Sequence, residues 1–129
     1  MATYTTFEQL PCWQKCQTIK LWLLEIVKRF PEYEKYELTF SIRKCIRSAT
    51  RNLAEGFGKF TIPDKVNFCR TSKGSLYELT DDLITAVEEG YISSDLYRYG
   101  RSLIEEAIAS INGYISYLNS RRDGDWEPR

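Results

Sequence analysis

The sequence of 129 residues contains no histidine, and its four cysteines lack the paired Cys-x-x-Cys spacing of structural zinc sites. Histidine is the most frequent general base and metal ligand in proteins, so the usual catalytic and metal-binding arrangements are missing. The Glu-x-x-His pairs that hold di-iron centres in helical bundles are excluded for the same reason. Cys45 and Cys69 fall on apolar faces of expected helices, which is typical of small core residues. We therefore expect no metal, no cofactor and no enzymatic activity.

Other signals are also missing. No apolar run approaches the roughly 20 residues of a membrane span, and Met1-Ala2-Thr3-Tyr4 has no signal-peptide organisation. The cysteine usage and the lack of a signal predict a cytoplasmic, reduced protein. The chain carries 18 basic and 18 acidic residues, and this zero net charge argues against a generic nucleic-acid coat.

Strand signals are weak, whereas apolar residues recur at helical spacing. The pattern predicts four amphipathic helices at about residues 12–30, 36–57, 63–89 and 95–122. Short connections between them predict an all-α, antiparallel up-down four-helix bundle. The bundle forms a single domain at residues 1–122, followed by a flexible tail at residues 123–129.

The expected second helix carries a row of arginines, Arg43, Arg47 and Arg51. Residues four apart lie nearly above one another on a helix, so the three side chains form a ridge about 12 Å long. The opposite face is apolar: Leu38, Ile42, Cys45, Ile46, Ala49 and Leu53. With the adjacent Lys44, these arginines are the main candidates for binding nucleic-acid phosphates. Arg70 and Lys73 are second candidates.

The charges are unevenly distributed along the chain. Residues 43–73 contain eight basic and two acidic residues, whereas residues 74–106 contain eight acidic and two basic ones. One interpretation is intramolecular pairing, in which the arginine ridge contacts Glu78, Asp81 or Asp82. The other is a free ridge that binds phosphates and is repeated in each subunit of an oligomer.

Four polar residues, Asn52, Glu55, Ser75 and Glu78, lie on adjacent turns of the second and third expected helices. We interpret them as a structural network that fixes helix register, because unsatisfied polar groups in a core are costly. An active site among Asn52, Glu55 and Glu78 is the alternative.

Aromatic residues make up 14% of the chain, and aromatics are enriched at protein interfaces. The first expected helix is apolar on more than one face, as in a central or interface helix. We expect an oligomer interface that includes Trp13, Leu21, Trp22 and Leu24.

Several blocks of the sequence match a known family. They are Phe7-Glu8-Gln9-Leu10 through Trp13-Gln14-Lys15, Ile42-Arg43-Lys44, Ser48, Asn52-Leu53-Ala54-Glu55-Gly56-Phe57-Gly58-Lys59, Gly74-Ser75-Leu76-Tyr77-Glu78-Leu79 and Gly90-Tyr91-Ile92. Through these blocks the chain resembles the bacterial four-helix-bundle proteins encoded in intervening sequences of 23S ribosomal RNA genes. The resemblance implies a non-enzymatic homo-oligomer, a pentamer that forms a ring.

The segment from Lys20 to Glu25, followed by Arg29-Phe30-Pro31, is also similar to a related branch. That branch comprises the accessory (Avd-type) proteins of diversity-generating retroelements, which resemble pentameric barrels and bind a reverse transcriptase and its template RNA. Two features depart from the family pattern. Thr50 stands where a proline is commoner, and this chain is neutral whereas the retroelement proteins tend to be basic.

The sequence and the resemblance together predict an oligomeric bundle that binds RNA or DNA, or a reverse transcriptase with its RNA. An alternative is a purely protein-binding oligomer, in which the acidic segment of residues 78–89 meets a basic partner. The sequence does not choose between an rRNA intervening-sequence role and a retroelement role.

Overall fold

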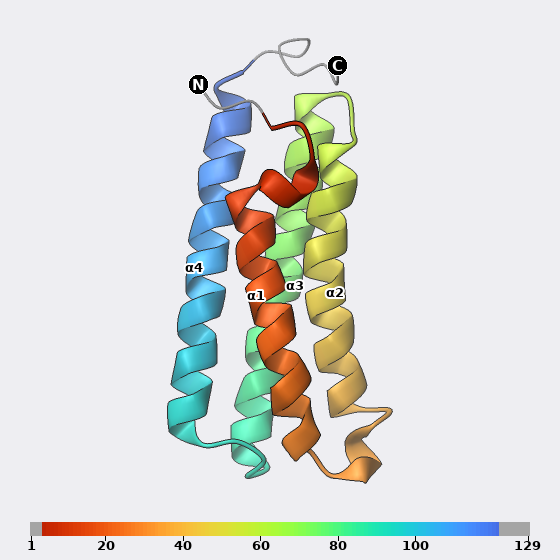
Figure 1. The fold of residues 1–129 in the computed structure, drawn as a ribbon, viewed down its shortest axis with the longest axis vertical. Helices are drawn as coiled ribbons and strands as arrows, with labels where there is room; N and C mark the ends of the chain where they lie inside the picture. Colours follow the sequence, from red (N-terminus) through yellow and green to blue (C-terminus); the bar gives the residue numbers. More distant parts are fainter. Residues whose placement is uncertain (1–3, 122–129) are drawn as a thin grey trace.

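The structure, a computed structural model, describes residues 4–121 and is built from four long helices. They are α1 (Pro11–Ile26), α2 (Leu38–Phe57), α3 (Ile62–Glu88) and α4 (Ser94–Asn119). The helices lie side by side and alternate in direction, so each short connection joins two antiparallel neighbours (Figure 1). No strand occurs within residues 4–121, and the all-α prediction is confirmed. The predicted tail at residues 123–129 lies outside the described residues.

The helix starts follow the capping signals in the sequence. Pro11 occupies the first turn of α1, where its missing N–H costs nothing. The side chain of Thr61 accepts a hydrogen bond from the Asp64 N–H at 3.3 Å, and Ser93 accepts one from the Leu96 N–H at 3.1 Å. At the end of α3, Gly90 has a φ of 79°, a conformation that favours glycine and stops the helix.

Three helix boundaries differ from the prediction, and one of them is the end of α4, which lies at Asn119 rather than near residue 122. The helix predicted to reach residue 30 ends at Ile26, and a short 3-10 turn, η2 (Val27–Arg29), follows it. Phe30 is extended because it precedes Pro31, which disfavours the helical conformation of the residue before it. A second 3-10 turn, η3 (Glu32–Glu34), occupies the connection, so α2 starts at Leu38 rather than at residue 36.

A buried carboxylate holds this connection against the far end of α3. Glu34 accepts a hydrogen bond from the Tyr91 hydroxyl at 2.7 Å and another from the Leu38 N–H at 3.3 Å. The first bond ties the connection to the residues between α3 and α4. The second satisfies a free N–H in the first turn of α2, as a capping side chain does.

The core lies along the bundle axis and receives apolar side chains from all four helices. Its fully buried members include Cys16, Ile42, Leu79 and Ile111. All four cysteines are free and buried, so the prediction that Cys45 and Cys69 are core residues is confirmed. Burial raises the pKa of the thiols of Cys12, Cys16 and Cys69 to about 12.

Lys65 is an unexpected core residue. Its side chain is fully buried near the start of α3, and its Nζ donates a hydrogen bond to the Phe57 carbonyl at 2.7 Å. The ammonium group therefore satisfies a carbonyl that the end of α2 leaves without a helical partner. Burial lowers the pKa of Lys65 to about 8. The sequence signal for this role is absent, because a lysine in the first turn of a helix is usually exposed.

Candidate nucleic-acid interface

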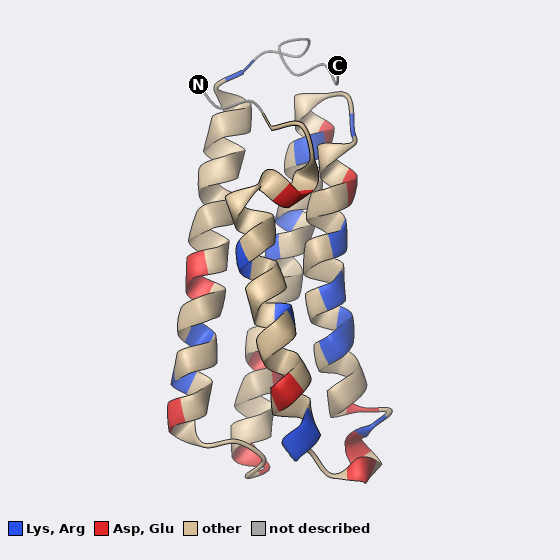
Figure 2. Ribbon diagram, viewed as in Figure 1, with Lys and Arg blue, Asp and Glu red and all other residues tan. Residues whose placement is uncertain are grey.

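The arginine row predicted from the sequence exists as a continuous basic surface on α2. Arg43, Lys44, Arg47 and Arg51 are all exposed. Figure 2 shows successive basic positions along one side of this helix. The opposite face of α2 supplies Ile42, Ile46, Ala49 and Leu53 to the core, which fixes the direction of the basic side chains. We call these four residues the α2 basic surface.

No acidic side chain of the described residues neutralises the α2 basic surface. Ion pairs within residues 4–121 join Lys28 to Glu25, Lys35 to Glu32, Arg98 to Asp95, and Arg101 to Glu105. None of them includes a member of the α2 basic surface, so the intramolecular pairing considered above is not what the structure shows.

Asp82, one of the acidic residues expected to pair with the ridge, instead faces another part of α2. Its carboxylate accepts a hydrogen bond from the Ser41 hydroxyl at 2.6 Å and lies 3.8 Å from the Cys45 sulfur. Burial raises the pKa of Asp82 above its ordinary value, and the Ser41 hydrogen bond partly opposes this shift. The Asp82 carboxylate therefore forms part of the contact between α2 and α3 and does not pair with the arginines.

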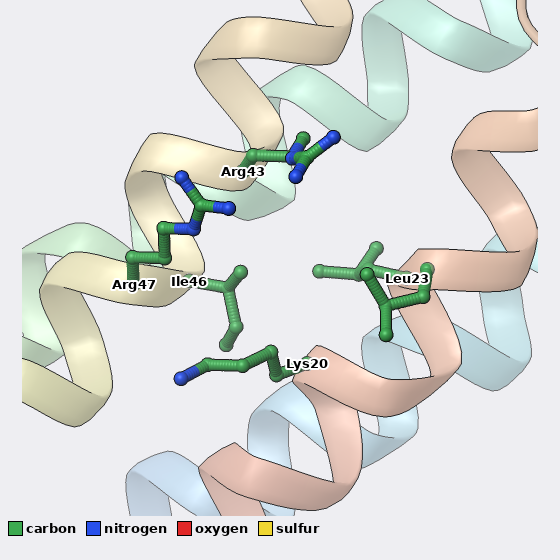
Figure 3. A pocket seen from close by; sticks show the side chains of 6 residues that line it. Lys20, Leu23, Arg43, Ile46 and Arg47 are labelled. Carbon is green, nitrogen blue, oxygen red and sulfur yellow. The ribbon is translucent and has the colours of Figure 1, made fainter.

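Lys20 of α1 adds a positive charge beside the α2 basic surface. It borders a small cavity of about 70 Å³ between α1 and α2, lined by Lys20, Leu23, Leu24, Arg43, Ile46 and Arg47. Figure 3 shows Lys20 on one side of this cavity, with Arg43 and Arg47 on the other. Partial burial, followed by the charges of Arg47 and Arg51, lowers the pKa of Lys20. The neighbouring charges of Arg47 and Arg51 thus oppose the positive charge of Lys20. The three cations together create a region of positive potential, which favours an anionic partner.

A larger, shallow groove runs along α2 and has a volume of about 640 Å³. It is lined by Lys35, Tyr36, Thr39, Phe40, Arg43, Lys44, Arg47, Ser48, Arg51 and Asn52. The groove thus combines the whole α2 basic surface with two aromatic rings at one end and three small polar side chains.

The second pair of candidates lies elsewhere. The Nζ of Lys73 donates a hydrogen bond to the Asn112 Oδ1 of α4 at 2.8 Å, so this side chain faces α4. Arg70 lies three residues earlier on α3 and therefore on the same side of the helix. The structure does not bring Arg70 and Lys73 together with the α2 basic surface.

The predicted polar network is present in part. Ser48 and Ser75 share a hydrogen bond of 2.7 Å between α2 and α3, and Asn52 donates to the Ser48 hydroxyl at 3.0 Å. Glu55 and Glu78, by contrast, are exposed and make no side-chain hydrogen bond among the described residues, so their inclusion was wrong. Sequence reasoning left out Ser48 from this network, and also Ser72, whose hydroxyl donates to the Ala49 carbonyl at 2.8 Å.

The sequence model of the 23S rRNA-intervening sequence protein family matches residues 8–113. The chain belongs to this family. The match covers all of α1, α2 and α3 and most of α4, and so includes the α2 basic surface. A comparison with curated proteins gives no match. The family prediction is confirmed, whereas the relation to the retroelement accessory proteins stays a prediction.

The four residues predicted to form an oligomer interface of this family member have different surroundings. Trp13 packs edge-on against Phe7, with ring centroids 5.4 Å apart. The Trp22 ring lies over Gly100 of α4 and 5.7 Å from the Tyr99 ring centroid. Both tryptophans are half-buried within the subunit, whereas Leu21 and Leu24 are 55% and 45% exposed. The two leucines are therefore the members of this set most available to a second subunit.

None of the helices that the structure describes is both long enough and apolar enough to cross a membrane.

Proposed function

We propose that this intervening-sequence family protein is a non-enzymatic, homo-oligomeric scaffold whose α2 basic surface binds nucleic acid. The observation that carries the proposal is four adjacent, exposed cations without an acidic partner among the described residues. Guanidinium groups match phosphate oxygens in two-point hydrogen bonds, and three arginines at helical spacing present such groups in a line. The zero net charge does not oppose this binding, because the positive charge is concentrated on one face.

The proposal predicts that the triple variant Arg43→Ala/Arg47→Ala/Arg51→Ala binds RNA far more weakly than the parent. Three lost phosphate contacts should lower the affinity by roughly tenfold to a hundredfold at about 50 mM salt. Fluorescence anisotropy with a labelled oligouridine measures this change. All three side chains are exposed, so circular dichroism should show an unchanged helix content.

A matched control removes three exposed cations from other parts of the bundle. The variant Lys28→Ala/Arg98→Ala/Arg101→Ala has the same net charge as the test variant, and each of its lost side chains is engaged in an ion pair. Its affinity should stay within about threefold of the parent, since these cations lie outside the α2 basic surface, already have acidic partners, and are screened by salt at a distance. Equal losses of RNA affinity in the two triple variants would show a general charge effect and would contradict the proposal.

The scaffold is proposed to be a ring of identical subunits, in the form of a homopentamer. A ring repeats one basic surface several times and so multiplies a modest affinity for a long nucleic acid. The exposed Leu21 and Leu24 on α1 are the proposed apolar contacts between subunits.

Replacement of these leucines by Leu21→Asp/Leu24→Asp should dissociate the oligomer, because burying a carboxylate at an interface is costly. Multi-angle light scattering at micromolar concentration should report an oligomer for the parent and a monomer for the variant, with helix content preserved in both. A monomeric parent at this concentration would refute the ring. The variant Tyr77→Asp, at an exposed position of α3, is the matched control and should leave the oligomer intact.

The physiological partner is proposed to be either RNA alone or a reverse transcriptase bound to its template RNA. Gene context distinguishes the two: a reverse transcriptase gene next to this one supports the retroelement role, and an rRNA operon supports the intervening-sequence role. Co-purification of a neighbouring reverse transcriptase with the parent but not with the triple arginine variant would place the polymerase–RNA complex on the α2 basic surface.

A further inference from the structure

We propose that the groove on α2 takes a single-stranded nucleic acid, with phosphates on the arginines and unpaired bases stacked on Phe40 and Tyr36. This inference rests on the proposed function, because it needs the α2 basic surface to bind nucleic acid. It adds two binding residues and restricts the partner to an unpaired strand.

The two aromatic rings continue the line of the basic surface. Phe40 lies three residues before Arg43 and four before Lys44, so it occupies the same stripe of α2 one turn closer to the start of the helix. Tyr36 lies in the turn that precedes α2, and both residues line the groove that contains all four cations. A strand that lies along the arginines therefore reaches the aromatic rings without changing direction.

Both rings are available to a partner because most of their surface faces solvent. Tyr36 is 81% exposed and Phe40 is 55% exposed. Neither ring packs against another aromatic ring within residues 4–121, and the neighbouring Lys35 ammonium lies 5.6 Å from the Tyr36 centroid. A free aromatic face beside cations is the combination found in sites for single strands, where bases stack while basic side chains follow the backbone.

The same geometry disfavours a duplex. In a duplex each base face is covered by its neighbours, so exposed rings gain no stacking partner from it. In a single strand the bases are free to rotate outward and stack on Phe40 and Tyr36. The cations recur about every 6 Å along the helix, a step comparable to the distance between adjacent phosphates of an extended strand.

A second copy of the chain is the rival occupant of the groove. Covering the groove with protein would bury four cations, and burying charges without partners is strongly unfavourable. Phosphates supply the opposite charge at each position, which favours a nucleic acid over an apolar subunit contact.

The test compares Tyr36→Ala/Phe40→Ala with the parent for a labelled oligouridine of about 16 nucleotides and for a hairpin duplex. We expect the affinity of the double variant for the single strand to fall about thirtyfold, at the lower end of the range measured for the loss of two stacked bases. Its affinity for the duplex should not change. Tyr77→Ala removes an exposed ring from α3 and is the matched control, with no expected effect.

Two further readouts separate stacking from other roles of the rings. A 2-aminopurine base in the oligonucleotide should change its fluorescence on binding the parent and not on binding the double variant, whereas Tyr36→Phe/Phe40→Trp should restore the signal. The salt dependence of binding should be the same for parent and double variant, because stacking releases no counterions.

The possible outcomes distinguish this inference from the proposed function. If the arginine variant loses binding while the aromatic variant binds like the parent, the stacking inference is overturned and the basic surface stands. If neither variant loses binding, both fail. If Tyr36→Ala/Phe40→Ala changes the oligomeric state in light scattering, the rings are subunit contacts and the inference is overturned.

Discussion

The free energy of unfolding should stay nearly constant up to about pH 9 and then fall by several kcal/mol before about pH 11. The cause is a set of buried thiols. Burial raises the pKa of Cys12, Cys16 and Cys69 from 9.0 to about 12, and that of Cys45 to about 11. Above pH 9 the unfolded chain releases these protons while the folded chain keeps them. The folded state then binds more protons, so its stability falls as the pH rises.

The titration of Lys65 changes the free energy of unfolding in the opposite direction, starting at a lower pH. Its pKa is lowered from 10.5 to about 8 by burial, so between these values the unfolded chain binds the extra proton and stability rises with pH. This gain begins near pH 8 and offsets the first losses from the thiols. Each thiol then costs roughly 1.4 kcal/mol per pH unit, and together the thiols outweigh the single lysine. The thiol contribution is fully present below pH 9 and is lost between pH 9 and about 12.

Urea unfolding followed by circular dichroism at about pH 7.5, 9, 10 and 11 measures this profile. A reductant must be present, and the protomer concentration must be fixed because oligomerisation couples to stability. The variant Cys12→Ala/Cys69→Ala should show a shallower decline above pH 9, and Lys65→Met should lose the compensating rise from pH 8. An equally stable parent at about pH 7.5 and 11 would contradict the assigned burial of these groups.

The substitution Gly56→Val should destabilise the bundle by about 3 kcal/mol, and Gly56→Ala should do so by less. Gly56 lies near the end of α2, where this helix lies close to α3. A Cβ atom added there would lie 2.7 Å from the Cβ of Phe68 and 3.4 Å from the Lys65 carbonyl oxygen. The Phe68 Cβ is fixed to the α3 backbone, so the two helices must separate to admit the new side chain.

The matched control is a glycine-to-alanine substitution at a position where the added methyl group has space. Gly74 lies in the middle of α3, and a Cβ there would meet nothing within 4 Å. Gly74→Ala should therefore stabilise the protein by up to about 1 kcal/mol, since alanine favours the helix more than glycine does. Urea unfolding of the two alanine variants should therefore show changes of opposite sign in the free energy of unfolding. A stabilising Gly56→Ala would show that the two helices are not in contact at this position.

The sequence was sufficient to predict the helices because their signals are local. Pro11, Thr61, Ser93 and Gly90 mark helix ends, and the apolar spacing between them distinguishes helices from strands. The largest errors occur in the connection before α2. There Pro31 shortens the preceding helical segment and the buried Glu34 holds a 3-10 turn, through a contact with a residue 57 positions away.

The candidate site was predictable only in part. The arginine row follows from helical spacing alone, but the approach of Lys20 depends on how α1 packs against α2. Whether the arginines were paired also depended on tertiary structure, because the carboxylate of Asp82 on α3 accepts a hydrogen bond from Ser41, on the same helix as the arginines. Glu55 and Glu78 were expected in a polar network from their spacing, yet the α2–α3 contact is made by the shorter Ser48 and Ser75.

The measurement that tests the central claim most directly is the salt dependence of oligouridine binding between about 50 mM and 200 mM salt. If Arg43, Arg47 and Arg51 each contact a phosphate, the slope of log K against log salt should be less steep by about 2 in their triple alanine variant than in the parent. The control variant Lys28→Ala/Arg98→Ala/Arg101→Ala should keep the parent slope. Identical slopes and affinities for the parent and the triple arginine variant would contradict the assignment of the α2 basic surface as the nucleic-acid site.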